Sequence, residues 1–352
     1  MIPISVCIIT KNEADNLEKC LEALSPYPFE VIVVDTGSTD DSKDVARKYT
    51  DKVYDFEWIN DFSAARNYAA SRASHNMILP IDTDEFVTDL DWEELQTLIE
   101  KNPKGVGAIK RLDYFEANGE KHYQICMVDR IYNRKYYQYE KAIHEVLSPT
   151  TRAPYSSYPT SVTADHIGYL GTKEKLDEKA KRDMDLLLKE VEAAPDNPYN
   201  YFQIAQCYLL MRDHEHALDY FKMAMEHSPN PKDEYTRILV CNYGNILLDY
   251  GRVEEASSLL SYYEYFHDNT DYLCMIGLIY LHLNQPLKAL PEYVKALTAS
   301  HRDSIDPVTP SYYIGYIYEL FGKNDIARTH YQNCKDFPPA VEALERLGKA
   351  QV

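Results

Sequence analysis

The sequence predicts an α/β domain with a mostly parallel sheet, followed by an all-α domain built from helical repeats. Two observations indicate this fold class. Up to residue 170, short runs of β-branched residues alternate with helical stretches, which is typical of parallel strands covered by helices on both faces. From residue 171 onwards, the chain is helical, rich in tyrosine and internally repeated. We therefore expect two domains, residues 1–170 and residues 171–352.

Four apolar runs in the first domain are predicted strands, and each is followed by a predicted helix. The strands are "ISVCIIT", "EVIVVDTGS", "KVYDFEW" and "MILPIDTDE", and the helices occupy residues 14–24, 40–49, 63–73 and 91–101. Residues 39–41 supply N-cap side chains for the second helix, and Ser63 does so for the third. From Gly105 onwards, the alternation gives way to mixed strands, "GVGAIKRLDYF", "QICMVDRIYNRK" and "SVTADHIGY".

The second domain contains a recurring helix-pair pattern. A small residue is followed twelve positions later by alanine and sixteen positions later by a large side chain, at Ala205, Gly244, Gly277 and Gly315. The spacing between these copies is 33 to 39 residues. The pattern is similar to the tetratricopeptide repeat, in which small residues let the first helix approach the second. An irregular helical bundle is the alternative. In either case, the aromatic residues are expected to form core and groove rather than a cofactor site.

Composition and charge argue against several classes of partner, with a local basic groove as the alternative. The formal net charge of −19 disfavours nucleic acid and anionic membrane surfaces, because both are bound through clustered Lys and Arg. Seven cysteines are scattered without a CxxC pair, as expected for core residues in a reducing compartment. No run of eighteen apolar residues occurs, and the N-terminal apolar stretch lacks the basic flank of a signal peptide. We therefore expect a cytoplasmic protein without a membrane span.

Polar side chains follow three of the predicted strands where each strand ends. Thr10, Asn12 and Glu13 end the first strand, Asp35 with Gly37 ends the second, and Asp82 to Asp84 end the fourth. Ligands of open parallel sheets bind beyond these carboxyl ends. Asp35 could accept a hydrogen bond from a base or a ribose. For "DTGSTD" taken alone, a simple turn with a helix cap explains the sequence equally well.

Asp82 and Asp84 suggest a metal. Side chains at i and i+2 of an extended segment point the same way, so the two carboxylates should converge and raise each other's pKa. A hard divalent cation, Mn²⁺ or Mg²⁺, would remove this conflict, and it usually shares its ligands with substrate phosphates. The alternative is a solvated acidic loop.

Four segments in this order, "SVCIITKNEADNL", "VIVVDTGSTDDS", "DFSAARNYA" and "LPIDTDEF", resemble the nucleotide-sugar half of a family 2 glycosyltransferase with the Rossmann-like GT-A fold. The resemblance covers residues 3–170, and "IDTDEF" takes the place of the DxD motif of that family. The attached repeats are similar to those of a bacterial subgroup that includes S-glycosyltransferases acting on bacteriocin peptides and enzymes building surface glycans.

The resemblance implies a role for particular residues. The nucleotide-sugar, with UDP expected, would contact Thr10, Asn12, Glu13, Asp35, Arg66, Asp82, Thr83 and Asp84. The metal would be held by Asp84, with Asp82, His166 and His144 as further candidates. Both histidines could instead be structural hydrogen-bonding residues. Arg130 and Lys135 could neutralise the leaving diphosphate, with surface salt bridges as the alternative.

The catalytic base is where the chain departs from the family pattern, because the usual pair of acids after the DxD motif is missing. Glu145 in "KAIHEVL" is the candidate, with Asp129 and Asp113 as alternatives. The expected function is an inverting, metal-dependent glycosyltransferase acting on a peptide, protein or glycan acceptor. The repeats would hold this acceptor or a second copy of the chain, giving a homo-oligomer. The rival is a non-catalytic interaction protein with a degenerate transferase domain. A nucleotidyltransferase is disfavoured because "TKNEADN" is not a Gly- and Arg-rich phosphate loop.

Overall fold

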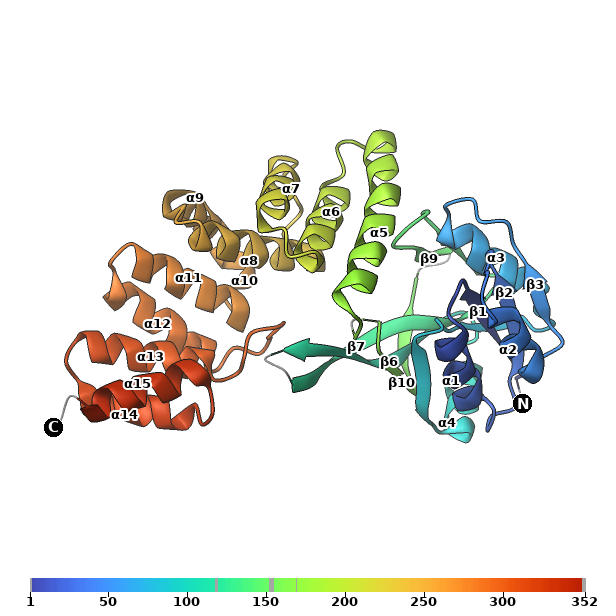
Figure 1. The fold of residues 1–352 in the computed structure, drawn as a ribbon, viewed down its shortest axis with the longest axis horizontal. Helices are drawn as coiled ribbons and strands as arrows, with labels where there is room; N and C mark the ends of the chain where they lie inside the picture. The colour runs from blue at the N-terminus through green and yellow to red at the C-terminus, as the bar shows by residue number, and fades with distance from the viewer. Residues whose placement is uncertain (1, 118–119, 152–154, 169, 350–352) are drawn as a thin grey trace. The chain divides into compact units, whose positions relative to one another are not determined.

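The computed structural model describes residues 2–117, 120–151, 155–168 and 170–349. The chain divides into two compact units, Met1–Leu186 and Leu187–Val352. The division falls inside helix α5 (Lys173–Ala193), whose first residue lies close to the change in sequence pattern at residue 171. An α/β unit followed by a helical repeat unit is the predicted fold class, which is confirmed (Figure 1).

The first unit is built on a sheet of eight strands in the order β3-β2-β1-β4-β7-β6-β10-β5. The parallel part consists of β1 (Ile4–Thr10), β2 (Glu30–Asp35), β3 (Val53–Asp55) and β4 (Met77–Pro80). The mixed part consists of β5 (Glu85–Leu90), β6 (Val106–Ala117), β7 (Glu120–Asn133) and β10 (Ser157–His166). Strands β8 (Tyr137–Glu140) and β9 (Val146–Pro149) form a separate pair.

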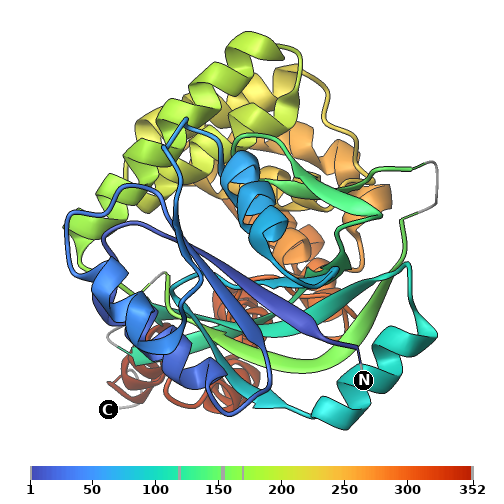
Figure 2. The same ribbon diagram turned by 90° about the vertical axis from the view of Figure 1, so that its right-hand side faces the viewer.

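Helices cover both faces of this sheet (Figure 2). Helices α1 (Ala14–Leu24), α2 (Ser42–Tyr49) and α4 (Trp92–Lys101) bury leucine, valine and isoleucine in one core on one face of the sheet. Helix α3 (Phe62–Arg72) packs its alanines with β8 and β9 on the other face. This two-sided burial explains why β1 and β2 are mostly apolar and do not alternate between apolar and polar residues.

The predicted N-cap of helix α3 is wrong. The helix begins at Phe62, and the carboxylate of Asp61 accepts a hydrogen bond of 2.9 Å from the backbone N–H of Ala64. Ser63 lies inside the first turn, where its hydroxyl donates to the carbonyl of Lys141. An aspartate one residue before the helix satisfies an otherwise free N–H group, which is what an N-cap does.

The second unit consists of antiparallel helix pairs. They are α6 (Pro198–Leu210) with α7 (His214–Glu226), α11 (Thr270–His282) with α12 (Pro286–Ala296), and α13 (Thr309–Leu320) with α14 (Asn324–Asn333), followed by α15 (Pro338–Lys349). In the second repeat, α8 (Glu234–Asp249) is followed by the short helices α9 (Val253–Ser257), η1 (Ser258–Tyr262) and α10 (Tyr263–Phe266).

Close approach of paired helices explains the small residues of the repeats. A Cβ atom built on Gly277 would lie 2.5 Å from the ring of Tyr293, and one on Gly315 would lie 2.9 Å from the ring of Tyr331. Both tyrosines stand sixteen residues after their glycine, as the repeat pattern requires, and both are fully buried. None of the described helices combines the length and the apolar character needed to cross a bilayer.

Candidate functional site

The candidate site lies where β1, β2 and β4 end. Thr10 and Asp35 are the last residues of β1 and β2, and they are neighbours in the parallel register. Strand β4 ends at Pro80, and residues 81–84 lead into β5. The register of the parallel strands thus brings the three predicted polar strand ends to one edge of the sheet.

Asp35 combines burial with an unused hydrogen-bonding atom. One carboxylate oxygen, Oδ1, accepts hydrogen bonds of 2.9 Å from the N–H groups of both Gly37 and Ser38, and Gly37 permits this turn with φ of +106°. Burial raises the pKa of Asp35, but the hydrogen bonds from Ser38 and Gly37 outweigh burial and lower it. Among the described residues, nothing hydrogen-bonds to Oδ2 of Asp35 or to Oγ1 of Thr10, although both atoms are buried. Buried polar atoms without partners are costly, so a ligand that donates to them would be stabilised.

Asn12 and Glu13 are engaged within the protein. Oδ1 of Asn12 accepts a hydrogen bond of 2.7 Å from the N–H of Thr39, and the backbone N–H of Asn12 donates to Ser38. Oε2 of Glu13 accepts from the side chain of Asn16. Asn12 therefore connects the loop after β1 to the loop after β2 and helps to hold both loops in place beside the site.

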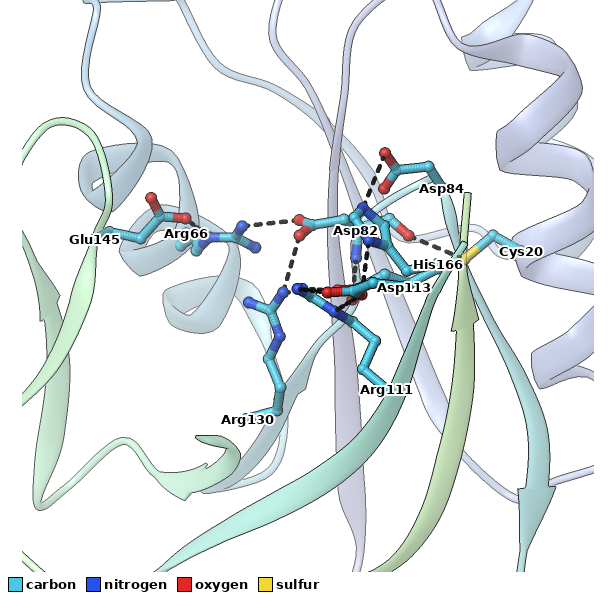
Figure 3. A network of polar contacts seen from close by, with 10 residues as sticks. Cys20, Arg66, Asp82, Asp84, Arg111, Asp113, Arg130, Glu145 and His166 are labelled. Carbon is cyan, nitrogen blue, oxygen red and sulfur yellow. Dashed lines mark hydrogen bonds and ion pairs between the residues drawn. The ribbon is translucent and has the colours of Figure 1, made fainter. Parts of the chain in front are cut away.

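Asp82 is held between two arginines (Figure 3). Arg66 donates to Oδ1 at 2.8 Å, and Arg130 donates to Oδ2 at 3.0 Å. Burial raises the pKa of Asp82, but both guanidinium groups outweigh burial and hold it well below its usual range. The predicted convergence of Asp82 with Asp84 is wrong, because the N–H of Glu85 donates to the carbonyl of Asp82 and closes a turn in place of an extended segment.

Arg66 also connects the site to Glu145. Its Nε donates to Oε1 of Glu145 at 2.5 Å, and both side chains are largely buried. Burial raises the pKa of Glu145, but the charge of Arg66 outweighs burial and lowers it. Glu145 is thus an ionised carboxylate on the loop between β8 and β9, and Arg66 links it to Asp82.

Glu85 anchors the network from inside the sheet. Its side chain is fully buried and accepts from Arg111 at 3.0 Å and from Arg130 at 2.8 Å, while its other oxygen accepts from the N–H of Asp82. The sequence pattern drew attention to Glu85 as one of three neighbouring carboxylates, but no role was predicted for Glu85 or Arg111. The signal was present, because three carboxylates directly after a buried strand require counter-charges and Glu85 alternates onto the same face as Val87.

Asp84 pairs with His166, the last residue of β10. Nε2 of His166 lies 3.6 Å from Oδ2 of Asp84, and Nδ1 lies 2.9 Å from Oδ1 of Asp113. Arg111 donates to both oxygens of Asp113, at 2.6 and 2.9 Å. Burial lowers the pKa of His166, but the hydrogen bond to Asp113 and the nearby negative charge of Asp84 outweigh burial and raise it to about 9. A cation that binds to Nε2 would take the place of the proton that this nitrogen carries in the protonated ring.

Gly168 approaches both Asp84 and His166 closely and carries no side chain that would stand between them. A Cβ atom built on Gly168 would lie 2.5 Å from Oδ2 of Asp84 and 2.5 Å from Nε2 of His166. These two atoms fit a small divalent cation that takes its remaining ligands from a substrate. In the described part of the chain, no group of three or more His, Cys, Asp or Glu side chains is arranged to hold a metal by itself.

Of the remaining predicted residues, Arg130 and Thr83 lie within the site, and the others do not join it. His144 adopts a φ of +49° beside Glu145 and does not join Asp84 and His166 in a cluster. Arg130 is buried and is paired with Asp82 and Glu85, whereas Lys135 is exposed after β7. Asp129, an alternative base, accepts hydrogen bonds from Tyr155 and Ser157. Thr83 is buried within the turn that separates Asp82 from Asp84.

Two protein-family models match parts of this chain, and one of them covers most of the site. Residues 5–159 match the model of glycosyl transferase family 2, and residues 198–231 and 270–300 match the tetratricopeptide repeat. Both matches agree with the resemblance inferred from the sequence motifs. The match to the transferase model includes Thr10, Asp35, Asp82, Asp84 and Glu145, and it ends before His166.

Similar curated proteins include transferases and a repeat protein. The chain is 27% identical over 249 residues to the SPbeta prophage-derived glycosyltransferase SunS of Bacillus subtilis, covering 66% of this chain and 56% of SunS. It is 29% identical over 177 residues to a TPR repeat-containing protein of Synechococcus elongatus, covering 48% and 43% of the two chains. The chain therefore spans about half the length of these curated relatives.

Two solved structures resemble about half of the chain. MamA has a TM-score of 0.38 at 18% identity, covering 51% of this chain and 99% of MamA. YrrB, a TPR protein, has a TM-score of 0.40 at 17% identity, covering 48% of this chain and 84% of YrrB.

Proposed function

We propose that this chain, which carries a family 2 glycosyl transferase domain followed by tetratricopeptide repeats, is an inverting glycosyltransferase that moves a sugar from a nucleotide-sugar to an acceptor. The observation that carries the proposal lies at the carboxyl ends of β1 and β2, within the region that matches the transferase family. There, Oδ2 of Asp35 and Oγ1 of Thr10 are buried without partners among the described residues.

The donor is proposed to be a UDP-sugar. Oδ2 of Asp35 has no hydrogen-bond partner in the described part of the chain, so it can accept from a base N–H or a ribose hydroxyl, and Thr10 can donate or accept beside it. The hydrogen bonds of Asp35 to Gly37 and Ser38 hold the carboxylate in place before the ligand arrives. Such preorganisation reduces the entropy lost on binding.

Asp84 and His166 are proposed to hold Mn²⁺ or Mg²⁺ together with the diphosphate of the donor. Their facing atoms and the open space beside Gly168 support this assignment. When bound, the cation would stabilise the negative charge that develops on the departing diphosphate. Asp82 is proposed to act from its fixed position between Arg66 and Arg130, where its remaining exposed surface can accept from the ribose.

Glu145 is proposed to accept the proton of the acceptor. The acceptor nucleophile forms a bond to the anomeric carbon from one side while the bond from that carbon to the diphosphate oxygen breaks on the other. The configuration of the sugar therefore inverts, and the bonding electrons leave with the diphosphate. Arg66 keeps Glu145 ionised, and this ionised form is the one that can take up a proton.

The acceptor is proposed to be a peptide or protein that the repeats bind. Tetratricopeptide repeats form extended surfaces, and two regions of the second unit match this family. Self-association of the repeats, which would give a homo-oligomer, and transfer to a glycan remain predictions. Assays with peptides and with glycans as acceptors distinguish transfer to a glycan from transfer to a peptide or protein.

Thermal unfolding with nucleotides tests the donor site. UDP with Mn²⁺ should raise the Tm, since a ligand at 100 times its Kd stabilises the native state by about 2.7 kcal/mol. Asp35→Asn should abolish most of the rise, whereas the exposed Asp51→Asn should retain it. Hydrolysis of a panel of nucleotide-sugars then identifies the donor. If no nucleotide raises the Tm and no donor is hydrolysed, the proposal is wrong and the non-catalytic interaction protein is the remaining interpretation.

A further inference from the structure

Three strands that are distant in the sequence place Glu85, Asp113 and His166 side by side. In the register of the sheet, His166 on β10 is opposite Glu85 on β5 and opposite Asp113 on β6. Side chains at directly opposed positions of neighbouring strands stand on the same face and within contact distance. The row is therefore a product of strand pairing, and each of its members is held by the sheet.

Within this row, Asp113 can determine which nitrogen of His166 carries a hydrogen. Asp113 is gripped by two hydrogen bonds from Arg111, so its oxygens are acceptors, and Oδ1 lies 2.9 Å from Nδ1 of His166. In the neutral imidazole, an acceptor at Nδ1 keeps the hydrogen on that nitrogen and leaves the lone pair on Nε2. Nε2 is the nitrogen that faces Asp84.

Arg111 also connects Asp113 to the loop that carries Asp84. Its Nη1 donates to the buried Glu85, and Glu85 in turn accepts from the backbone N–H of Asp82. The orientation of His166 and the path of the loop at residues 82–84 thus depend on one set of buried charges. A buried charge that loses its partner destabilises its surroundings strongly, which gives this set little freedom to rearrange.

Gly168 determines how much space is left between Oδ2 of Asp84 and Nε2 of His166. Only a hydrogen atom stands where a Cβ would be 2.5 Å from both Oδ2 of Asp84 and Nε2 of His166. Any larger side chain would occupy the space between the two ligand atoms. This observation is independent of the hydrogen bond to Asp113, and both point to the same pair of atoms.

We propose that Asp113 and Gly168 are positioning residues of the cation site: Asp113 presents Nε2 of His166 to the cation, and Gly168 keeps the space between His166 and Asp84 open. The inference rests on the proposed function, because it requires that a divalent cation binds to Asp84 and His166. The ligand set of one carboxylate oxygen and one imidazole nitrogen suits Mn²⁺ better than Ca²⁺, which prefers oxygen ligands.

The first test measures Mn²⁺ binding by electron paramagnetic resonance in the presence of UDP, without any turnover. Asp113→Asn should weaken Mn²⁺ binding by about 10- to 100-fold, the effect usual for the loss of a residue that orients a metal ligand. Asp165→Asn removes the neighbouring acid of β10, which alternates to the other face, and should bind Mn²⁺ as the wild type does. Equal binding by Asp113→Asn and wild type would overturn the role of Asp113 while leaving the proposed function intact.

The second test reads the tautomer of His166 directly. In protein labelled with ¹⁵N-histidine and kept without metal at a pH where the imidazole is neutral, the wild type should show the hydrogen on Nδ1. Asp113→Asn should shift the signals towards the form with hydrogen on Nε2, because an amide can also donate to Nδ1. A role of Asp113 that is merely structural would leave the tautomer unchanged, and this result would contradict the inference.

Gly168→Ala tests the open space. It should lose Mn²⁺ binding while retaining the Tm of the wild type within a few degrees, whereas Gly348→Ala, where nothing lies within 4 Å of the added atom, should change neither. Normal Mn²⁺ binding by Gly168→Ala would overturn the role of Gly168. If Gly168→Ala lowers the Tm strongly, Mn²⁺ binding is measured at a temperature where it is folded, and the same two outcomes decide. If wild type binds UDP but no Mn²⁺, the cation part of the proposed function fails, and this inference fails with it.

Discussion

The buried Arg66 forms an ion pair of 2.8 Å between its Nη2 and Oδ1 of the partly buried Asp82, and the same guanidinium holds Glu145 through its Nε. One side chain of helix α3 thus connects the acid that follows β4 with the acid between β8 and β9. In the proposed reaction, this arrangement links the donor side of the site to the proposed base.

Removal of Arg66 should destabilise the first unit. Arg66→Ala leaves the largely buried Glu145 without its counter-charge and leaves Asp82 with Arg130 alone, and the loss of one partner from a buried pair costs up to about 3–5 kcal/mol. Arg66→Lys should recover only part of this, because an ammonium cannot reach both carboxylates with a planar fork. Arg72→Ala, in the exposed last turn of the same helix, should cost about 1 kcal/mol or less. Urea unfolding monitored by circular dichroism measures these differences, and equal losses for Arg66→Ala and Arg72→Ala would contradict the prediction.

Asp84→Ala should abolish transfer and Mn²⁺-dependent nucleotide binding while the fold stays intact. Its carboxylate is 25% exposed and is paired with His166, which keeps its hydrogen bond to Asp113 when Asp84 is removed, so the substitution leaves no buried charge without a partner. Asp89→Ala, an exposed acid on β5, is the matched control and should behave as the wild type. Titration of UDP with and without Mn²⁺ checks the prediction. Normal nucleotide binding by Asp84→Ala would show that the metal assignment is wrong.

Glu145→Gln should lower turnover by about 10²-fold or more and leave the affinity for the nucleotide-sugar nearly unchanged, because a base acts on the acceptor. The amide can still accept from Arg66, so the pair is weakened rather than lost. Glu140→Gln, an exposed residue at the end of β8, serves as the control. Equal losses in binding and turnover would make Glu145 a donor-site residue. Full activity would direct attention to Asp129, because Asp113 is already bound to Arg111 and His166.

Gly277→Ala should destabilise the second unit. The added Cβ would lie 2.5 Å from the buried ring of Tyr293, and overpacking of this kind costs about 1–3 kcal/mol. Gly348→Ala offers the same change in open space and should not destabilise. Thermal unfolding of the two variants compares them. No loss of stability in Gly277→Ala would mean that α11 and α12 pack differently from the tetratricopeptide arrangement.

Much of the fold was predictable because its signals are local. Continuous β-branched runs indicated parallel strands, and the fixed distance from Gly277 to Tyr293 indicated paired helices. Helix ends were less certain, since Asp61 and Ser63 are both good N-caps and only the backbone decides between them. The same locality placed Asp35 and Asp84 at strand ends, where a parallel sheet collects its ligand-binding residues.

Only the tertiary structure decided how the charged residues are combined. From the sequence alone, Asp82 and Asp84 were a converging pair. In the structure, a turn at residues 82–85 directs Asp82 to Arg66 and Arg130 and directs Asp84 to His166. The row of Glu85, His166 and Asp113 depends on the register of three strands, and a shift of one residue would turn the side chains of a strand to the opposite face. Strand periodicity is written into neighbouring residues, whereas register is set by packing between segments that are far apart in the chain.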